Sequence, residues 1–355
     1  MKILLIIPTL KQGGAERVMS ILANNFSQKN IDTHLIILTK SNDFFTINKK
    51  VTIHRIGFEN NNFLSKKLSE LKTFFRLRKL IKNEKPDFVL SFMEKYNILT
   101  ILASSFLNAN IFISDRRNPL NKLPKHIVFF RRLTYKYATG YIAQTSLARD
   151  YIKERKLNKN IRIIHNPVQV RNENETIKHN TTIINVGRLI PEKGQHYLIE
   201  AFSKLRNREW KLIILGDGPL RNQLELQIQE LNLEDRVILK GTVNNVVDWL
   251  KESSIFAFTS ITEGFPNALT EAMAVGLPCV SFDCNAGPRD LIINGENGFL
   301  IPLKDVESLA FTLDKLADDY LLRDKIGNKA KEIRYKLDEN KIAEEFLDFF
   351  VSVTQ

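Results

Sequence analysis

Two glutamates stand eight positions apart in a short, mainly apolar segment, TEGFPNALTEAMAVGLP, residues 262–278. Pro266 suits the first turn of a helix, and Gly276, soon followed by a proline, is a helix stop. The residues between them are apolar on every side, which predicts a buried helix. Glu271 lies inside this helix and Glu263 just before it. A buried carboxylate is costly unless something binds it, and the hydroxyl groups of a sugar or ribose would do so.

A second group of residues has the chemistry to hold phosphate. Arg188 and Lys193 lie in VGRLIPEKG, residues 186–194, between a strand pattern and a helix pattern. Two cations on one loop can clamp a diphosphate, the arginine as a planar fork and the lysine as a point charge. The free N–H groups at the start of the short helix, residues 267–269, form a natural anion site.

A glycine pair follows the first apolar run of the chain. Gly13 and Gly14 separate KILLIIP from a helical pattern, and glycines there let backbone N–H groups approach an anion at a helix N-terminus. Taken together, the three strand ends favour a sugar nucleotide as ligand. Each feature alone has an ordinary alternative: a turn for the glycines, solvated charges for the cations, and ion pairs with Lys or Arg for the glutamates.

Several other chemistries lack their motifs. The chain has no G-x-G-x-x-G and no G-x-x-x-x-G-K-[ST], which removes support for dinucleotide and Walker-type binding. None of the six histidines has the spacing H-E-x-x-H, and no D-x-D is present. We therefore expect no metal site, no cofactor and no metal-dependent mechanism.

Strand and helix patterns alternate along the chain, and these elements would position the residues above. The apolar runs are KILLIIP, THLIILT, DFVLSF, NIFIS and GYIAQT in the first half, and TIINVG, KLIILG, RVILKG, IFAFTS and PCVSF in the second. Apolar strands alternating with helices predict parallel sheets covered on both faces. We predict an α/β protein of two doubly wound, Rossmann-like domains facing across a cleft, with ligands beyond the carboxyl ends of the strands.

Composition suggests where the domains divide. The polar stretch RNENETIKHN, residues 171–180, is the predicted linker. It separates a first domain, residues 1–170, from a second, residues 181–337, and the last helix, about residues 338–355, is a candidate to pack back on the first domain.

These motifs resemble family-4 glycosyltransferases. GGAERV after the first strand, VGRLIPEKG, LGDGPLRNQLE and TEGFPNALTEAMAVGLP carry the resemblance, which covers essentially the whole chain and is most specific in the second half. It implies the GT-B fold and retaining transfer from a nucleotide sugar. Within the family, the chain is most similar to bacterial enzymes that extend lipid-linked oligosaccharides for surface polysaccharide or protein glycosylation.

The resemblance implies a role for each matching residue. Arg188 and Lys193 would bind the donor diphosphate and, without a metal, stabilise it as it leaves. Glu263 would hold hydroxyls of the transferred sugar. The remaining donor-binding residues would be Gly13, Gly14, Gly187, Gly241, Val243, Gly264, Phe265, Asn267, Ala268, Leu269 and Glu271, with the last on the ribose.

The first half departs from the family at one place. Many members have a histidine after a first-half strand, whereas FISDRRNP here has Asp115 and Arg116 at that place and no histidine. Both are predicted on the acceptor side. The resemblance further suggests UDP as carrier and a hexose or N-acetylhexosamine as the sugar.

The charge of the chain is uneven. The formal net charge is +12, but residues 1–170 carry 30 Lys and Arg against 11 Asp and Glu, a net +19, and the remainder carries −7. Such asymmetry calls for an anionic partner, with nucleic acid and an anionic membrane surface as the obvious candidates.

Two basic segments favour the membrane. Residues 66–85 hold eight Lys and Arg against two Glu, and apolar positions near one predicted helical face are Leu68, Leu71, Phe75 and Ile81, with Phe74 and Leu77 beside it. Residues 124–137 add further cations with aromatic side chains that look exposed. Basic amphipathic helices suit a membrane surface, although a core-facing helix with a solvated basic back is an equal alternative for either segment alone.

The compartment follows from what the chain lacks. The apolar run at the N-terminus is too short for a signal peptide, and no stretch is long enough to span a membrane. We therefore expect a cytoplasmic protein, peripheral at the inner face of the cell membrane, in which Cys279 and Cys284 are packing residues without a disulfide. Two other functions stay open: a nucleotide-sugar epimerase of the same architecture, and a nucleic-acid binder, which we disfavour because no recognised module is present.

Overall fold

The computed structural model describes residues 1–39, 42–57, 63–169 and 180–354, with the backbone alone for residues 63–67. The chain forms two compact domains. The first comprises Met1–Pro167 and Glu339–Gln355, and the second comprises Val168–Asp338. The predicted linker, residues 171–180, lies outside the described residues except for Asn180.

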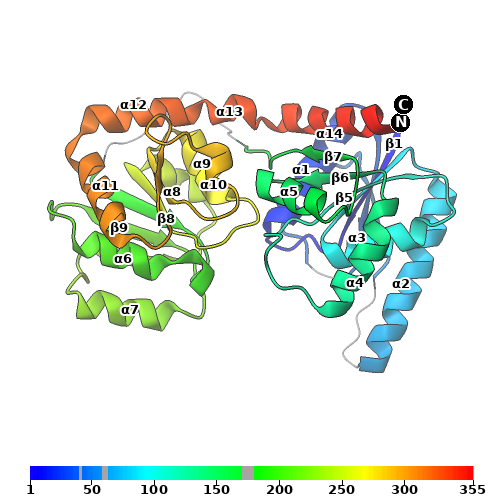
Figure 1. Ribbon diagram of the computed structural model, residues 1–355, viewed down its shortest axis with the longest axis horizontal. Coiled ribbons are helices and arrows are strands. Elements are labelled where there is room, and N and C mark those ends of the chain that lie inside the picture. The colour runs from blue at the N-terminus through cyan, green and yellow to red at the C-terminus, as the bar shows by residue number, and fades with distance from the viewer. Residues whose placement is uncertain (40–41, 58–62, 170–179, 355) are drawn as a thin grey trace. The chain divides into compact units, whose positions relative to one another are not determined.

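The first domain is built on a seven-stranded parallel sheet in the order β3-β2-β1-β4-β5-β6-β7 (Figure 1). Its strands are mostly buried on both faces, as expected for a parallel sheet covered by helices. The strands are β1 (Lys2–Ile7), β2 (Asp32–Ile37), β3 (Thr52–Arg55), β4 (Phe88–Phe92), β5 (Asn110–Ser114), β6 (Gly140–Ala143) and β7 (Ile161–Ile163).

Helices cover both faces of this sheet. Apolar residues of α2, α3 and α5 pack with the strands in two core clusters, and in Figure 1 α2, α3 and α4 lie together along the same side of the domain. The helices of this layer are α2 (Phe63–Glu84), α3 (Glu94–Ser104), α4 (Lys125–Thr134), the 3₁₀ turn η1 (Tyr135–Tyr137) and α5 (Ser146–Glu154).

The C-terminal helix α14 (Glu339–Thr354) packs on the first domain beside α1 (Gly14–Gln28). Phe350 is buried, and its ring lies 4.4 Å from that of Phe112 in β5. The Asn25 amide of α1 donates to Asn340 Oδ1 at 2.6 Å. Aromatic packing and this polar contact therefore hold α14 against β5 and α1 of the first domain.

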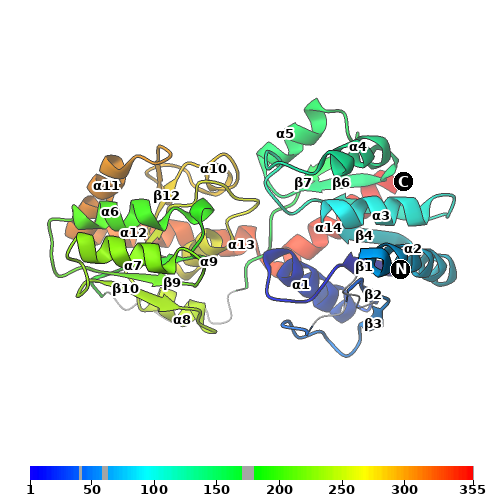
Figure 2. The same cartoon turned by 90° about the horizontal axis from the view of Figure 1, so that it is seen from below.

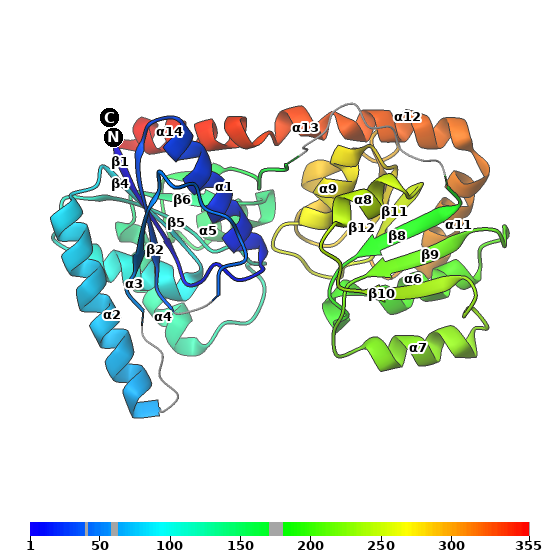
Figure 3. The ribbon, with the colours of Figure 1, turned by 180° about the vertical axis from the view of Figure 1, so that it is seen from behind.

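The second domain has a six-stranded parallel sheet in the order β10-β9-β8-β11-β12-β13. In Figure 3, β8–β10 lie between α6 and α7 below and α8 and α9 above. The strands are β8 (Thr182–Val186), β9 (Lys211–Leu215), β10 (Val237–Gly241), β11 (Ile255–Phe258), β12 (Cys279–Phe282) and β13 (Phe299–Ile301).

The helices of the second domain form two layers. One layer contains α6, α7 and α11, which lie side by side (Figure 2) and share one hydrophobic cluster with the sheet. On the other face α9 contacts α8, α12 and α13. The helices are η2 (Pro191–Lys193), α6 (Gln195–Ser203), α7 (Arg221–Glu230), α8 (Val246–Lys251), α9 (Asn267–Val275), α10 (Pro288–Leu291), α11 (Val306–Asp318), α12 (Tyr320–Lys331) and α13 (Ile333–Lys336).

The predicted α/β class with two parallel sheets is confirmed, and each predicted apolar run contains a strand. The sequence pattern missed β3, β7 and β13, which have three or four residues each and lie at sheet edges. Edge strands bury less than central strands do, so their residues are not uniformly apolar. Among the described residues, no helix combines the length and the apolar content that crossing a membrane requires.

Candidate functional site

The carboxyl edge of the second sheet gathers the loops that carry the predicted phosphate-binding residues. Gly187 follows β8, and its N–H donates to Leu215 O at 2.9 Å, which ties this loop to the end of β9. Gly216 has a φ of +136°, and a Cβ there would collide with Gly187 O. This close backbone approach suits only glycine. The loop after Gly187 then presents Arg188, whose side chain is exposed.

Lys193 and Glu263 form an ion pair at this edge. Lys193 Nζ lies 2.6 Å from Glu263 Oε1, and the side chains are only 23% and 10% exposed. Gly194, with a left-handed φ of +61°, packs so closely on the loop after β11 that a Cβ would collide with Thr259 O. Thr259 Oγ1 in turn donates to Lys193 O at 3.1 Å. The ion pair that the sequence left open as an alternative for Glu263 is therefore present, on loops from two different strands.

Helix α9 starts after Pro266 and ends at Gly276, where φ is +101°, as predicted. The prediction of a buried helix is confirmed for six of its nine residues. Glu271 is half-buried, as are Asn267 and Ala268, while the other residues of the helix are buried. Positions 267, 268 and 271 share one face because residues four apart are neighbours on a helix. The Glu271 side chain therefore lies on the same partly exposed helix face as the first residues of α9. Because Glu271 is only half-buried, keeping its carboxylate charged costs less desolvation energy.

The start of α9 offers amides without helical acceptors. The N–H of Asn267 donates to Phe265 O at 3.0 Å, and that of Thr270 donates to Pro266 O at 3.0 Å. Between them, the first-turn amides of Ala268 and Leu269 have no carbonyl within their own helix to accept them. Gly264 is half-buried and Phe265 buried, so the loop that enters the helix is packed rather than extended into solvent.

The loop after β10 joins the same edge. Gly216 N–H donates to Gly241 O at 2.8 Å, and Gly241 has a φ of +83°. Arg221 Nη2 fastens this loop by donating to Leu239 O at 3.1 Å. Val243 lies two residues further on and is half-buried. The structure thus brings Gly241 and the Arg188 loop to one end of one sheet.

Both cysteines are buried and free, in agreement with the sequence expectation. Burial first, and then the negative charge of Glu263, raises the pKa of the Cys284 thiol to about 12. Cys284 therefore stays neutral at physiological pH and acts as an apolar neighbour of Glu263.

The first domain places Asp115 in its interior. The carboxylate accepts from Tyr135 Oη, from Tyr141 Oη at 3.1 Å and from the Asn97 amide at 3.1 Å, and it pairs with Arg131 at 2.8 Å. Asp115 and Arg131 are 5% and 3% exposed. We predicted that Asp115 lies on the acceptor side. Contact with an acceptor would require the Asp115 carboxylate to leave these hydrogen bonds and its ion pair with Arg131. Arg131 is likewise not the membrane-facing cation that its position in residues 124–137 suggested.

Arg116 is half-buried and has no carboxylate partner among the described residues. Its guanidinium stacks 3.7 Å from the Phe92 ring and donates through Nη1 to Asn166 Oδ1 at 2.8 Å. Burial lowers the pKa of Arg116 to about 9. The backbone at Arg116 has a φ of +63°, so this conformation carries strain that the surrounding packing must hold.

Comparison with known proteins decides the family. Residues 12–172 match the family model Glycosyltransferase Family 4, and residues 169–333 match the model Glycosyl transferases group 1. The Escherichia coli UDP-Gal:alpha-D-GlcNAc-diphosphoundecaprenol alpha-1,3-galactosyltransferase is 30% identical over 284 residues, 72% of each chain. The chain belongs to glycosyltransferase family 4.

Full-length relatives agree with this assignment. The Campylobacter jejuni GalNAc-alpha-(1->4)-GalNAc-alpha-(1->3)-diNAcBac-PP-undecaprenol alpha-1,4-N-acetyl-D-galactosaminyltransferase is 28% identical over 360 residues and covers 99% of both chains. Anabaena HepE, solved in complex with UDP, superposes with a TM-score of 0.81 at 21% identity and covers 99% of this chain and 100% of its own. The fold is therefore that of the GT-B enzymes, and the protein is a glycosyltransferase.

In this glycosyltransferase, the Glu16 carboxylate lies against Gly13, where we predicted that a donor phosphate would bind. Glu16, buried in the first turn of α1, accepts from Thr9 Oγ1 at 3.1 Å, and a Cβ on Gly13 would collide with its Oε2. A carboxylate is the group that a helix N-terminus favours. Contact of Gly13 and Gly14 with a donor phosphate stays a prediction, and it requires the Glu16 carboxylate to move aside.

Glu94 of this glycosyltransferase was not among the site residues predicted from the sequence. It opens α3 directly after β4, at the carboxyl edge of the first sheet, and its Oε1 lies 3.7 Å from the exposed Arg117. Burial first, and then the negative charge of Asp115, raises the pKa of Glu94 to about 7. A carboxyl group that titrates near neutral pH suits proton transfer or hydroxyl recognition. The only signal in the sequence was its position just after an apolar strand.

Proposed function

We propose that this glycosyltransferase moves a hexose or N-acetylhexosamine, with retention, from a UDP-sugar to a lipid-linked saccharide. The observation that carries the donor proposal is the Lys193–Glu263 ion pair at 2.6 Å, beside the exposed Arg188 and the start of α9. It sets a cation and a hydroxyl acceptor side by side, and these are the groups that a diphosphate joined to a sugar needs.

The ion pair between Lys193 and Glu263 would break when a nucleotide sugar binds. Hydroxyls of the transferred sugar would donate to Glu263, and the Lys193 ammonium would turn to the diphosphate together with Arg188. Glu271, on the open face of α9, would accept from the ribose hydroxyls. Because Glu263 is nearly buried, its hydrogen bonds to the sugar would form in a poorly solvated site, where such bonds are strong.

The chemical step needs charge stabilisation more than a protein nucleophile. The acceptor oxygen would bond to the anomeric carbon on the face that the diphosphate leaves, the bond from that carbon to the phosphate oxygen would break, and the acceptor proton would pass to a phosphate oxygen. Arg188 and Lys193 would stabilise the negative charge that develops on the leaving diphosphate. We propose that no metal takes part in this step, so activity should survive EDTA.

The acceptor proposal draws on the relatives. The names of the Escherichia coli and Campylobacter jejuni enzymes both contain a saccharide joined through a diphosphate to undecaprenol. Nothing in the comparisons favours the epimerase alternative. A lipid-linked acceptor resides in a membrane, so we place the glycosyltransferase at the inner face of the cell membrane, attached peripherally.

The outer side of α2 supports membrane contact. Thr73, Leu77 and Ile81 face the core, whereas Leu68, Leu71 and Phe75 are exposed. The sequence expectation that Ile81 shares a face with Leu68 is therefore wrong, because the helix has two apolar stripes. The outer stripe alternates with the exposed cations Lys72, Lys79 and Lys82. Apolar side chains between cations on one helix face suit an anionic interface.

Helix α4 adds apolar surface on the same layer of the domain. Phe129 is 59% exposed, and Val128, Phe130 and Leu133 are exposed as well, next to Arg132. The prediction that aromatic residues of this segment are exposed is confirmed for Phe129, Phe130 and Tyr137, whereas Tyr135 is buried. Single exposed apolar residues are ordinary, but four in one short helix mark an interaction surface.

Calorimetry with UDP tests the donor site. Arg188→Ala and Lys193→Ala should each weaken UDP binding by about 10- to 150-fold, because each removes a charge-assisted contact worth roughly 1.5–3 kcal/mol. Lys211→Ala, an exposed lysine at the opposite end of the same sheet, is the matched control and should bind UDP like wild type. Unchanged UDP affinity in both site variants would remove the diphosphate site from this edge.

A further inference from the structure

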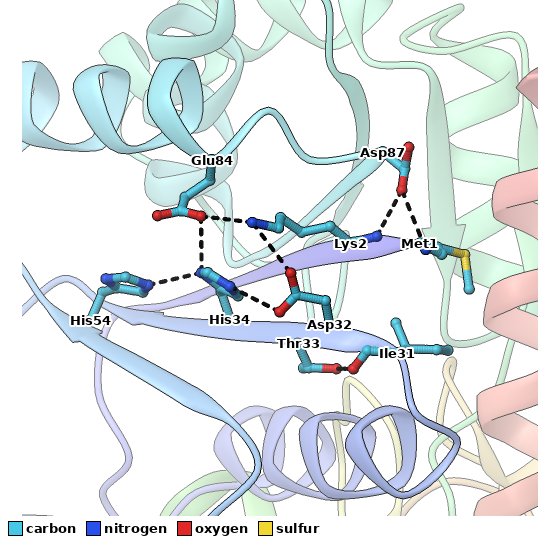
Figure 4. A network of polar contacts seen from close by, with 9 residues as sticks. All are labelled: Met1, Lys2, Ile31, Asp32, Thr33, His34, His54, Glu84 and Asp87. Carbon is cyan, nitrogen blue, oxygen red and sulfur yellow. Dashed lines mark hydrogen bonds and ion pairs between the residues drawn. The ribbon is translucent and has the colours of Figure 1, made fainter.

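A polar cluster in the first domain lies apart from the donor residues. His34, His54 and Glu84 each offer one ligand atom, and these atoms all lie within 4.8 Å of one another (Figure 4). His34 is buried, while His54 and Glu84 are half-buried, so the cluster is enclosed on one side and reachable from the other.

The sheet register brings these residues together. His34 lies on β2 and His54 on β3, where Ile36 pairs with His54, so the two histidines are diagonal neighbours on one face. Their rings stack with centroids 5.0 Å apart. Glu84 is the last residue of α2, which packs over that face. Three elements thus converge on one point.

Two of the three separations between these ligand atoms are close to those around a small transition-metal ion, and the third is within 4.8 Å. Zn²⁺ with bonds of ~2.0–2.1 Å in tetrahedral geometry places its ligand atoms ~3.3 Å apart. His34 Nδ1 lies 2.9 Å from His54 Nε2 and 3.7 Å from Glu84 Oε2, on either side of that value. Shifts of a few tenths of an ångström would equalise these two distances.

A supporting carboxylate is also in place. His34 Nε2 lies 3.1 Å from Asp32 Oδ1. A histidine that donates one ring N–H to a carboxylate presents the lone pair of its other nitrogen, which is the usual arrangement behind a metal-bound histidine. Here the nitrogen so presented is His34 Nδ1, the atom that faces His54 and Glu84.

Lys2 balances the charge of the carboxylates. Its Nζ lies 2.8 Å from Glu84 Oε2 and 3.2 Å from Asp32 Oδ2 (Figure 4). A metal ion would take over Glu84 and leave the ammonium to Asp32. Lys2 is therefore a competitor whose removal should strengthen metal binding, whereas removal of a ligand should weaken it.

We propose that His34, His54 and Glu84 bind a zinc ion, or another divalent ion that prefers imidazole, with solvent as the remaining ligand. The ion would fasten the last turn of α2 to β2 and β3. The role is structural, because the ligands lie on β2, on β3 and at the end of α2, whereas the predicted donor residues of this domain follow the carboxyl end of β1. The sequence expectation of no metal site rested on motif spacing, and these ligands are 20 and 30 positions apart in the chain.

Zinc titration of the full chain, without an affinity tag and freed of metal, tests the proposal. Calorimetry should show one equivalent of Zn²⁺ bound, and differential scanning calorimetry should show a Tm that rises with zinc concentration. Zinc binding should weaken at least tenfold in each of the ligand variants His34→Gln, His54→Gln and Glu84→Gln. It should weaken about 10- to 100-fold in Asp32→Asn, which removes the supporting carboxylate. The control His126→Gln changes an exposed histidine on α4 and should bind zinc like wild type.

Lys2→Gln tests the proposal even if a histidine variant does not fold. This variant removes the competing ammonium and should bind zinc more tightly than wild type. Cobalt offers an independent readout, since Co²⁺ in the wild-type site should give visible absorption bands that His54→Gln lacks. The proposal fails if wild type binds no zinc stoichiometrically, if His34→Gln and His54→Gln bind it like wild type, or if Lys2→Gln binds it more weakly.

Discussion

Lys193 Nζ and Glu263 Oε1 lie 2.6 Å apart, although 70 positions separate the two residues in the chain. Their loops follow β8 and β11, which are neighbours in the second sheet. The pair therefore exists only because a parallel sheet brings the carboxyl ends of its strands to one edge. It also makes the two residues energetically dependent on each other, so their substitutions should not be additive.

Glu263→Gln should abolish sugar transfer while UDP binding stays within about threefold of wild type. In our proposal Glu263 contacts the sugar and not the nucleotide, and its loss releases Lys193 for the diphosphate. Calorimetry with UDP and a transfer assay measure the two effects separately. A variant that loses UDP affinity as severely as activity would show that Glu263 contacts the nucleotide.

Gly194→Ala should destabilise the second domain and disable the Lys193 loop. The new Cβ would meet Thr259 O, and φ is +61°, so strain and collision together should cost at least about 2 kcal/mol. Gly295→Ala is the matched control, because φ there is +81° but no atom lies within 4 Å, so only the backbone strain of about 1 kcal/mol applies. Urea unfolding measures the free energy of unfolding of both variants. An equal decrease in the two would show that the contact between residue 194 and Thr259 adds no cost.

Glu94 should make the stability of the enzyme depend on pH. Its pKa in the folded chain is about 7, against an ordinary value of 4.5, so the folded state holds this proton more tightly than the unfolded state does. Stability from this group is present below pH 4.5 and is lost as the pH rises towards 7, by up to about 3 kcal/mol. Glu94→Gln should abolish that loss.

Urea unfolding of wild type and Glu94→Gln at pH 5.5, 7 and 8.5 measures the effect. The stability advantage of the glutamine variant over wild type should grow as the pH rises. A constant difference across this range would show that the Glu94 carboxyl titrates as an ordinary exposed one does.

Membrane binding should depend on the outer side of α2. Lys79→Glu with Lys82→Glu should release the enzyme from anionic liposomes, because each lysine near such a surface contributes about 1 kcal/mol. Lys304→Glu with Lys325→Glu, exposed lysines of the second domain, change the net charge equally and should leave binding intact. Flotation at low and high salt reads out the difference. Wild-type protein that ignores anionic liposomes even at low salt would rule out this role.

The structure also changes which cations such an experiment should target. Arg131 belongs to a strongly basic segment, and the sequence could not separate it from Arg132. Its guanidinium is buried on Asp115, whereas Arg132 is exposed. Reversing the charge of Arg131 would leave two buried negative charges facing each other and unfold the domain, so it cannot report on membrane binding.

Local patterns made much of the second domain predictable. Pro266 and Gly276 mark the ends of α9 in the sequence, and the apolar runs mark the central strands, because both signals act within a few residues. The open face of α9 was not predictable from these signals. Glu271 is half-buried through the way neighbouring helices pack, and that packing leaves no mark within the helix itself.

Long-range contacts account for most of what was missed. The cluster of His34, His54 and Glu84 depends on the register between β2 and β3 and on where α2 ends, and no spacing rule contains either. The Asp115 network likewise draws on four other elements. Glu16 covers Gly13 because a first-turn side chain folds back, a conformation that the motif GGAERV does not specify.

A transfer assay tests the central claim most directly. The enzyme is incubated with a panel of UDP- and GDP-sugars and a saccharide linked through diphosphate to a polyprenol, and mass spectrometry follows the acceptor, with Glu263→Gln in parallel. We predict that the acceptor gains the mass of one hexose or N-acetylhexosamine from one UDP-sugar, in the presence of EDTA, and that Glu263→Gln forms no product. An acceptor of unchanged mass with every donor, or equal product from Glu263→Gln, would contradict the account.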